Sequence, residues 1–148
     1  MIARALALNP NLRMAWHVSG FINVWIGDHA TASEHFAKAE RLSPLDPLLF
    51  NTHVGIAHAS FFAGRYAEAA SCATATLRER PNHFASLRIA AASLAFEDRT
   101  DEAEACVEKL LRIDPSLTVS NVKETLGPYR PNLLAKFEEG LRKAGLPE

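Results

Sequence analysis

Four prolines divide the chain into segments of nearly equal length. Pro10, Pro44, Pro81 and Pro115 are separated by 34, 37 and 34 residues. Small and apolar residues between them recur at the same offsets. The aligned sets are Gly27, Gly64 and Asp98; Ala32, Ala69 and Ala103; and Phe36, Ala73 and Val107. A period of this length, in which turn residues and core residues recur together, is typical of a protein built from stacked repeats.

Helical periodicity fills the segments between these turn residues. Apolar residues recur three and four positions apart, so the sequence predicts an all-α fold. Gly27 is expected to end the first helix of the first unit in the left-handed conformation, and Gly64 is expected to end the first helix of the second. Asp28 and Thr100 are expected to cap the second helices of the first and third units. The second helix of the middle unit is predicted at residues 66–79.

The middle unit differs from the others in length. Three extra residues lie between Pro44 and the next unit, and they are expected to lengthen its first helix by nearly one turn. Asp46 followed by Pro47 is a favourable start for that helix, because aspartate caps the end and proline fits the first turn.

The chain is interpreted as one domain of five segments. Residues 1–10 are expected to be the tail of a preceding repeat, and the repeats themselves are expected at 12–46, 47–81 and 82–115. The pattern breaks after Pro115. Residues 116–148 are therefore expected to form a capping pair of helices, at 120–126 and 131–144. Since the first helix before residue 2 is missing, the chain is interpreted as part of a longer protein or as an unusually ended repeat.

Composition limits the classes of partner. With 48% hydrophobic residues, the 148-residue chain has enough apolar surface for a core. The net charge of −1 does not indicate binding to nucleic acid or to an acidic membrane surface. No apolar run approaches the 18 residues of a membrane span. Cys72 and Cys106 stand apart without a paired motif, so reduced thiols in a cytoplasmic protein are expected.

One unit carries the residues of a known repeat family. The matching residues are Trp16, Gly20, Ala32, Phe36 and Pro44, at the spacings of the tetratricopeptide signature. Ser19 replaces the leucine of that signature and Asn23 replaces its aromatic residue. The chain therefore resembles tetratricopeptide-repeat (TPR) proteins. The resemblance implies an α-α superhelix, a TPR solenoid of three helix-turn-helix repeats with a C-terminal capping helix pair.

In that family the first helices line a concave groove that holds peptide ligands. Here the groove is expected to be apolar and aromatic, with two histidines and one arginine. Its expected residues are Met14, His17, Phe21, Val24, Trp25, Asn51, Val54, His58, Phe61, Phe62, Arg88 and Phe96. Aromatic and arginine side chains are frequent hot spots of binding. Trp25, Phe62 and Phe96 can instead pack between repeats, and Arg88 can either meet a carboxylate or remain at a solvated rim.

No pattern typical of catalysis or metal binding occurs. His53 and His58 are five positions apart rather than four, so a zinc site is not predicted. The nucleophile, metalloprotease and phosphate-loop motifs are absent. The Lys, Asn and Arg with which some TPR domains clamp the terminal carboxylate of chaperones are also missing from their places. We therefore expect no enzyme activity, metal or cofactor, and a protein or peptide as the partner.

Three further stretches carry a second resemblance, at residues 4–11, 42–47 and 129–147. With them the chain resembles the C-terminal TPR region of bacterial class III adenylate/guanylate cyclases. The catalytic domain of such enzymes is not in these residues, so the resemblance implies a regulatory or oligomerising segment of a larger signalling protein. At the N-terminal end, Leu6 and Ala3 are the expected contacts of a homodimer, because a half repeat leaves apolar surface uncovered.

Overall fold

A computed structural model describes residues 1–148, and every regular element in it is helical. The elements are α1 (Ile2–Leu8), α2 (Arg13–Ile26), α3 (His29–Leu42), α4 (Leu49–Phe62), α5 (Tyr66–Glu79), α6 (Phe84–Phe96), α7 (Thr100–Ile113), the 3₁₀ helix η1 (Val122–Thr125) and α8 (Pro131–Lys143). The predicted all-α class is confirmed, and the helix predicted at residues 66–79 is confirmed as α5. No helix combines the length and apolar composition that a membrane span requires.

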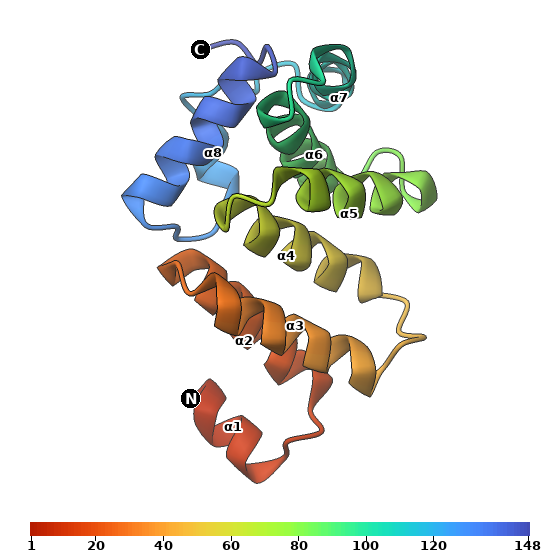
Figure 1. The fold of residues 1–148 in the computed structure, drawn as a ribbon, viewed down its shortest axis with the longest axis vertical. Helices are drawn as coiled ribbons and strands as arrows, with labels where there is room; N and C mark the ends of the chain where they lie inside the picture. The colour runs from red at the N-terminus through yellow and green to blue at the C-terminus, as the bar shows by residue number, and fades with distance from the viewer.

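The helices pack in the order of the sequence. Three pairs, α2 with α3, α4 with α5 and α6 with α7, follow one another along the long axis of the molecule (Figure 1). Between the pairs, α3 contacts α4 and α5 contacts α6. The first helices of the pairs also touch in turn, because α4 contacts both α2 and α6. These three first helices therefore form one continuous face.

The three pairs turn in the same way. The turn residue has a positive φ in each, 90° at Gly27, 82° at Gly64 and 57° at Asp98. In each turn the next backbone N–H donates to the carbonyl five residues earlier, at 2.9 to 3.0 Å. This is the Schellman arrangement that terminates helices. The predicted left-handed end at Gly27 and the predicted helix end at Gly64 are thus confirmed, and Asp98 adopts the same conformation as both without being glycine.

Phe36 of α3 holds the first two pairs together. Its side chain is fully buried, and it lies between glycines on two neighbouring helices. A Cβ atom at Gly20 of α2 would lie 2.5 Å from Phe36 Cε1, and one at Gly55 of α4 would lie closer still to Phe36 Cζ. The ring fills the space that the two missing Cβ atoms leave, which allows both backbones to approach it closely.

Two predictions about helix starts are wrong. The three extra residues do not lengthen α4, which has 14 residues like α2; they lie in the loop before Leu49. Asp46 keeps this loop out of the helix by accepting from Leu48 N at 2.7 Å and pairing with Arg13 at 3.3 Å. Thr100 is not a cap either, because it is the first residue within α7 and makes no capping hydrogen bond.

The predicted cap at Asp28 is confirmed. Its Oδ1 accepts from Thr31 N at 3.1 Å, and its Oδ2 accepts from the Thr31 hydroxyl at 2.8 Å. Asp28 therefore satisfies one of the unpaired N–H groups at the start of α3.

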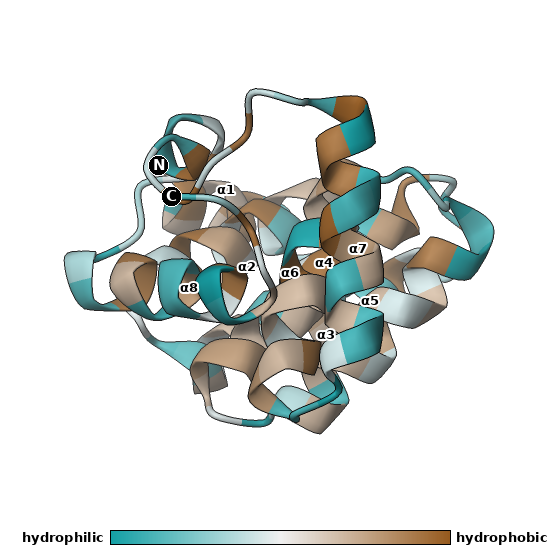
Figure 2. Cartoon of the chain, turned by 90° about the horizontal axis from the view of Figure 1, so that it is seen from above, coloured by the Kyte–Doolittle hydropathy of each residue, from teal (hydrophilic) through white to brown (hydrophobic).

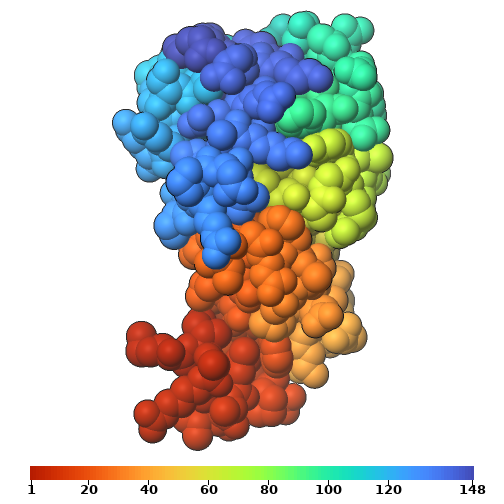
Figure 3. Space-filling view, turned by 60° about the vertical axis from the view of Figure 1, so that its left-hand side comes forward, coloured from red at the N-terminus to blue at the C-terminus, as the bar shows by residue number.

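The C-terminal segment folds back over the repeats rather than extending beyond them. Figure 3 shows its residues, in blue, lying over the upper pairs and reaching the orange residues of the first pair. Leu133, Phe137 and Leu141 on one side of α8 are buried, and α8 packs against α6. Hydrophilic and hydrophobic residues alternate around this outer helix in Figure 2, as expected for a helix with one covered face.

The expected capping pair of helices is only half present. Instead of two helical turns at 120–126, the structure has the single 3₁₀ turn η1. Reciprocal hydrogen bonds between Thr118 and Asn121 close a turn just before it, with Asn121 Oδ1 accepting at 2.8 Å and Thr118 Oγ1 at 3.2 Å. Gly127 and Pro128 then follow, which leaves too few residues for an α-helix.

At the other end, α1 is a seven-residue helix without buried residues. It contacts α2 and projects from the lower end of the molecule (Figures 1 and 3). Leu6 is half-buried and Ala3 is exposed.

Candidate functional site

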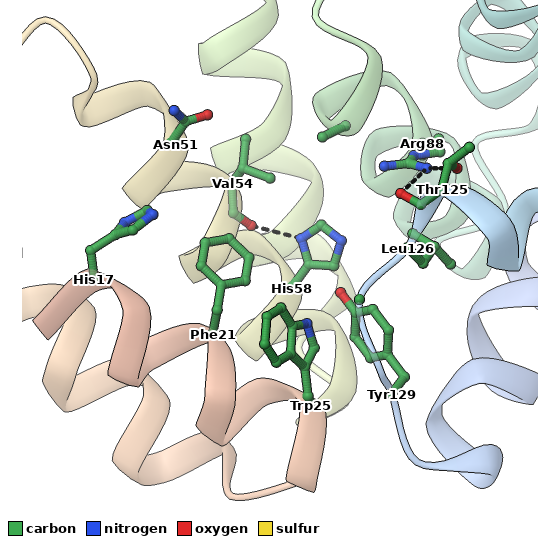
Figure 4. A pocket seen from close by; sticks show the side chains of 12 residues that line it. His17, Phe21, Trp25, Asn51, Val54, His58, Arg88, Thr125, Leu126 and Tyr129 are labelled. Carbon is green, nitrogen blue, oxygen red and sulfur yellow. Dashed lines mark hydrogen bonds between the residues drawn. The ribbon is translucent and has the colours of Figure 1, made fainter. Parts of the chain in front are cut away.

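A pocket of about 240 Å³ lies on the face formed by α2, α4 and α6. Figure 4 shows side chains of α2 and α4 on one side of the pocket, and Arg88 of α6 beside Thr125 and Leu126 on the other. Its lining residues are His17, Phe21 and Trp25 from α2, Asn51, Val54 and His58 from α4, Ala85 and Arg88 from α6, and Thr125, Leu126, Gly127 and Tyr129 from the C-terminal segment. The pocket is therefore a junction between three successive helix pairs and the end of the chain.

Seven of the expected groove residues meet in this pocket. They are His17, Phe21, Trp25, Asn51, Val54, His58 and Arg88. These residues come together because the first helices of the three pairs lie side by side and present equivalent positions to one side. The pocket is smaller than the expected groove, since the C-terminal segment closes one end of it.

The other five expected groove residues do not line the pocket. Val24 and Phe61 are fully buried, Phe62 is 8% exposed, and Phe96 is half-buried with its ring stacked on Tyr66. Phe61 and Phe62 both contact the ring of Phe137 on α8. Burial by α8 removes the phenylalanines from any ligand. Met14 is exposed but lies outside the pocket.

The sequence allowed Trp25, Phe62 and Phe96 to lie either in the groove or between repeats, and the structure divides them. Phe62 belongs to the core and Phe96 packs against it, whereas Trp25 lies at the pocket wall. Trp25 also holds the C-terminal segment. Its carbonyl accepts from Arg130 N at 3.1 Å, and its indole ring leaves no room for a side chain at Gly127.

Arg88 is a buried cation and not a solvated rim residue, which corrects one of the two interpretations of its position. It is 7% exposed. Its Nη1 donates to the Thr125 carbonyl at 3.3 Å and to Thr125 Oγ1, and its Nε is buried without a partner. The guanidinium carbon lies 5.0 Å from the centre of the Phe84 ring. Burial lowers the pKa of Arg88, but an arginine remains charged at neutral pH.

His58 lies beneath the pocket as a neutral imidazole. Burial lowers its pKa from 6.5 to about 4; the charge of Arg88 contributes to this shift and the hydrogen bond to the Val54 carbonyl opposes it. Nδ1 lies 2.8 Å from the Val54 carbonyl oxygen, which can only accept, so the proton is on Nδ1. Nε2 then carries a free lone pair and can accept a hydrogen bond. The ring packs between Tyr129 and Phe137 from the C-terminal segment.

His17 belongs to a polar network at the other end of the pocket. Thr52 Oγ1 accepts from Arg13 Nη2 at 3.1 Å and lies 3.0 Å from His17 Nδ1. The threonine hydroxyl can therefore donate its own hydrogen to His17. Burial lowers the pKa of His17, and the charge of Arg13 lowers it further. Asn51 lies nearby, half-buried, and its side chain makes no hydrogen bond with the protein.

Sequence reasoning missed the four lining residues from the C-terminal segment. Thr125, Leu126, Gly127 and Tyr129 were expected in a distant cap. Only the Gly127-Pro128 break hints that the chain changes direction there. No local pattern shows that it turns back onto the first helices.

The other side chains with potential reactivity are the metal-ligating groups and the two cysteines. No group of three or more His, Cys, Asp and Glu side chains is placed to hold a metal ion. Burial raises the pKa of Cys72 to about 11 and also raises that of Cys106. Both thiols are free and protonated at neutral pH, so neither is an activated nucleophile.

Comparisons with known proteins leave the family of the chain open. No model of a known protein family matches the sequence. No curated protein is significantly similar to it. The function is therefore inferred from the geometry of the pocket and from the repeat pattern.

Proposed function

We propose that the chain is a TPR-type superhelix that acts as a non-catalytic scaffold and binds a peptide or a partner domain on its concave face. The binding site in this proposal is the pocket between α2, α4 and α6. The observation that carries it is that three successive first helices contribute side chains to one pocket.

The repeat pattern supports the TPR part of the proposal. The three helix pairs share one turn geometry, and residues at the signature positions perform the packing that the signature implies. Phe36 fits against Gly20, and Ala32 beside it is fully buried. Small residues at these places permit the close approach of neighbouring helices.

The chemistry of the pocket supports the binding part. Phe21 and Trp25 are only half-buried and offer apolar surface, whereas Asn51 offers a free amide. A preformed surface of this kind loses little conformational entropy when a ligand binds. Hydrogen bonds from the amide and apolar contact with the rings suit an extended peptide.

Selection from a displayed peptide library, followed by calorimetric titration, tests the proposal. We expect selected peptides to shift the amide resonances of α2 and α4 around the pocket, and Phe21→Ala to weaken their binding at least about tenfold. Phe50→Ala is the matched control. Phe50, on α4, is a half-buried phenylalanine like Phe21 but lies outside the pocket. Equal binding by both variants and the wild type would contradict a site at this pocket.

A second candidate function is assembly through the N-terminal end of the stack, as in the regulatory segment of a bacterial cytoplasmic class III cyclase. Exposed apolar side chains on α1, on α2 and in the turn between them favour it. They are Leu8 at 80%, Met14 at 48%, Ile26 at 45%, Leu12 at 42% and Ile22 at 36% exposure. Ile22 and Ile26 are one helical turn apart and therefore share a face of α2.

Sedimentation equilibrium of the double variant Ile22→Glu/Ile26→Glu tests this candidate. We expect the wild type to associate and the variant to remain monomeric, because two carboxylates on this face oppose its burial. Ile113→Glu at the opposite end of the stack is the control, since Ile113 is similarly exposed at 46%. A monomeric wild type at high concentration would exclude assembly through this end.

A further inference from the structure

The guanidinium of Arg88 is a buried charge without an opposite charge. It is more than nine-tenths buried, and both groups that accept from it, the carbonyl and hydroxyl of Thr125, are neutral. It takes part in none of the seven ion pairs of the protein, and its Nε has no partner. Buried arginines are normally paired with an anion, because removing the charge from water is costly.

The pocket next to Arg88 contains nothing that would neutralise it. Its twelve lining residues include no aspartate or glutamate. His58 beside it is neutral and presents the free lone pair of Nε2, and the rings of Trp25 and Tyr129 form low-dielectric walls. A single positive charge among such walls attracts anions more strongly than it would in water.

We propose that this pocket binds a carboxylate group of an apolar peptide through Arg88. The guanidinium suits a carboxylate because its Nη2 donates to no group of the protein and can form a charge-assisted hydrogen bond with it. The volume of about 240 Å³ suits one terminal residue and excludes a folded element. Phe21 and Trp25 contact the apolar side chain, and the amide of Asn51 is free to bind the peptide backbone. This inference rests on the proposed function, whose ligand it specifies.

The test uses a matched pair of peptides on the protein with Arg88 intact. N-acetyl-Ala-Leu with a free carboxylate and the same peptide with a C-terminal amide differ only in the charge that Arg88 would contact. Binding is followed by the fluorescence of Trp25 in a Trp16→Phe background, which leaves one tryptophan at the pocket. We expect the acid to bind at least about tenfold more tightly than the amide, as is typical for a charge-assisted hydrogen bond.

Two variants locate the contact. Arg88→Gln is expected to reduce acid binding to the level of the amide. Arg112→Gln removes the same charge from an exposed site on α7, and is expected to leave binding unchanged. A melting curve checks that each variant folds. Because the acid and amide are also compared on the protein that retains Arg88, the proposal is tested even if Arg88→Gln unfolds.

Further probes distinguish the source of the anion. An acetylated aspartyl amide carries its carboxylate on a side chain. Comparing its affinity with that of N-acetyl-Ala-Leu therefore shows whether the pocket binds the carboxylate of a chain end or that of an acidic side chain. Tighter binding of inorganic phosphate than of both would overturn the carboxylate assignment. Equal binding of acid and amide in the pocket would overturn this inference and leave the proposed function intact. If the displayed-library selection also yields no pocket ligand, the proposed function fails as well.

Discussion

At the scale of single residues, the tightest packing involves glycines. Gly55 lies against the fully buried ring of Phe36. Alanine is usually the better helix former by about 1 kcal/mol. Here the added methyl group would overlap the ring, and a fully enclosed phenylalanine has no space into which it can move. Steric overlap therefore outweighs helix propensity at this position.

We predict that Gly55→Ala lowers the free energy of unfolding by about 1–3 kcal/mol, the usual cost of overpacking a core. Urea unfolding measures this difference. In a Phe36→Leu background the cost of the same substitution should shrink, because the smaller side chain leaves room for the methyl group. An equal cost in both backgrounds would show that the ring is not its cause.

His58 gives a prediction for pH. Its pKa is about 4 in the folded protein and 6.5 as its ordinary value, so the folded state favours the neutral ring. As pH falls below the ordinary pKa, the unfolded chain takes up the proton first. Stability is therefore retained above pH 6.5 and is lost as pH falls towards 4. This single group accounts for a loss of about 2 kcal/mol between about pH 7 and about pH 5.

Urea unfolding of the wild type and His58→Gln at both pH values measures this contribution. His17, His29 and His83 also have lowered pKa values from burial. The test is therefore the difference between the two proteins, in which those contributions cancel. An identical pH dependence would mean that His58 does not titrate with a depressed pKa.

At the scale of helices, the start of α3 differs from the starts of α5 and α7. Asp28 caps α3 with hydrogen bonds to Thr31, whereas α5 and α7 begin without a side-chain cap. We predict that Asp28→Ala lowers the midpoint of urea unfolding. Thr100→Ala should leave it nearly unchanged, because Thr100 makes no capping hydrogen bond. A similar loss in both variants would contradict the assignment of caps.

At the scale of the whole molecule, α8 packs across more than one pair of the stack. Phe137 is 2% exposed and its ring meets those of His58, Phe61 and Phe62 on α4, while α8 itself packs on α6. In a linear stack each pair would contact only its neighbours, and unfolding could proceed pair by pair. The long-range contacts of α8 oppose this behaviour.

We predict that Phe137→Ala costs about 3 kcal/mol or more, as expected for the loss of a buried ring. In this variant, amide hydrogen exchange should increase more in η1 and α8 than in α4, because the C-terminal segment loses its main anchor. Leu134→Ala is the control, since Leu134 on the same helix is half-buried. Similar exchange in both variants would show that Phe137 does not hold the segment in place.

The predictions that succeeded depend on neighbours in sequence. The turns at Gly27 and Gly64 follow from the conformational freedom of glycine, and the cap at Asp28 follows from a carboxylate three residues before an N–H. The predictions that failed depend on distant residues. The loop before Leu49 remains non-helical because Asp46 pairs with Arg13, which lies 33 residues earlier in the sequence.

The sequence by itself determined that this chain is helical, where its hairpins turn, and seven of the side chains that α2, α4 and α6 contribute to the pocket. Only the tertiary structure decided that the last residues return to that side and enclose Arg88. The contact that does so joins Arg88 to Thr125, 37 positions away. Helices and turns are fixed by hydrogen bonds within a few residues, and so a local pattern encodes them. Closure of a long loop is decided by the surface buried at its end, which no local pattern contains.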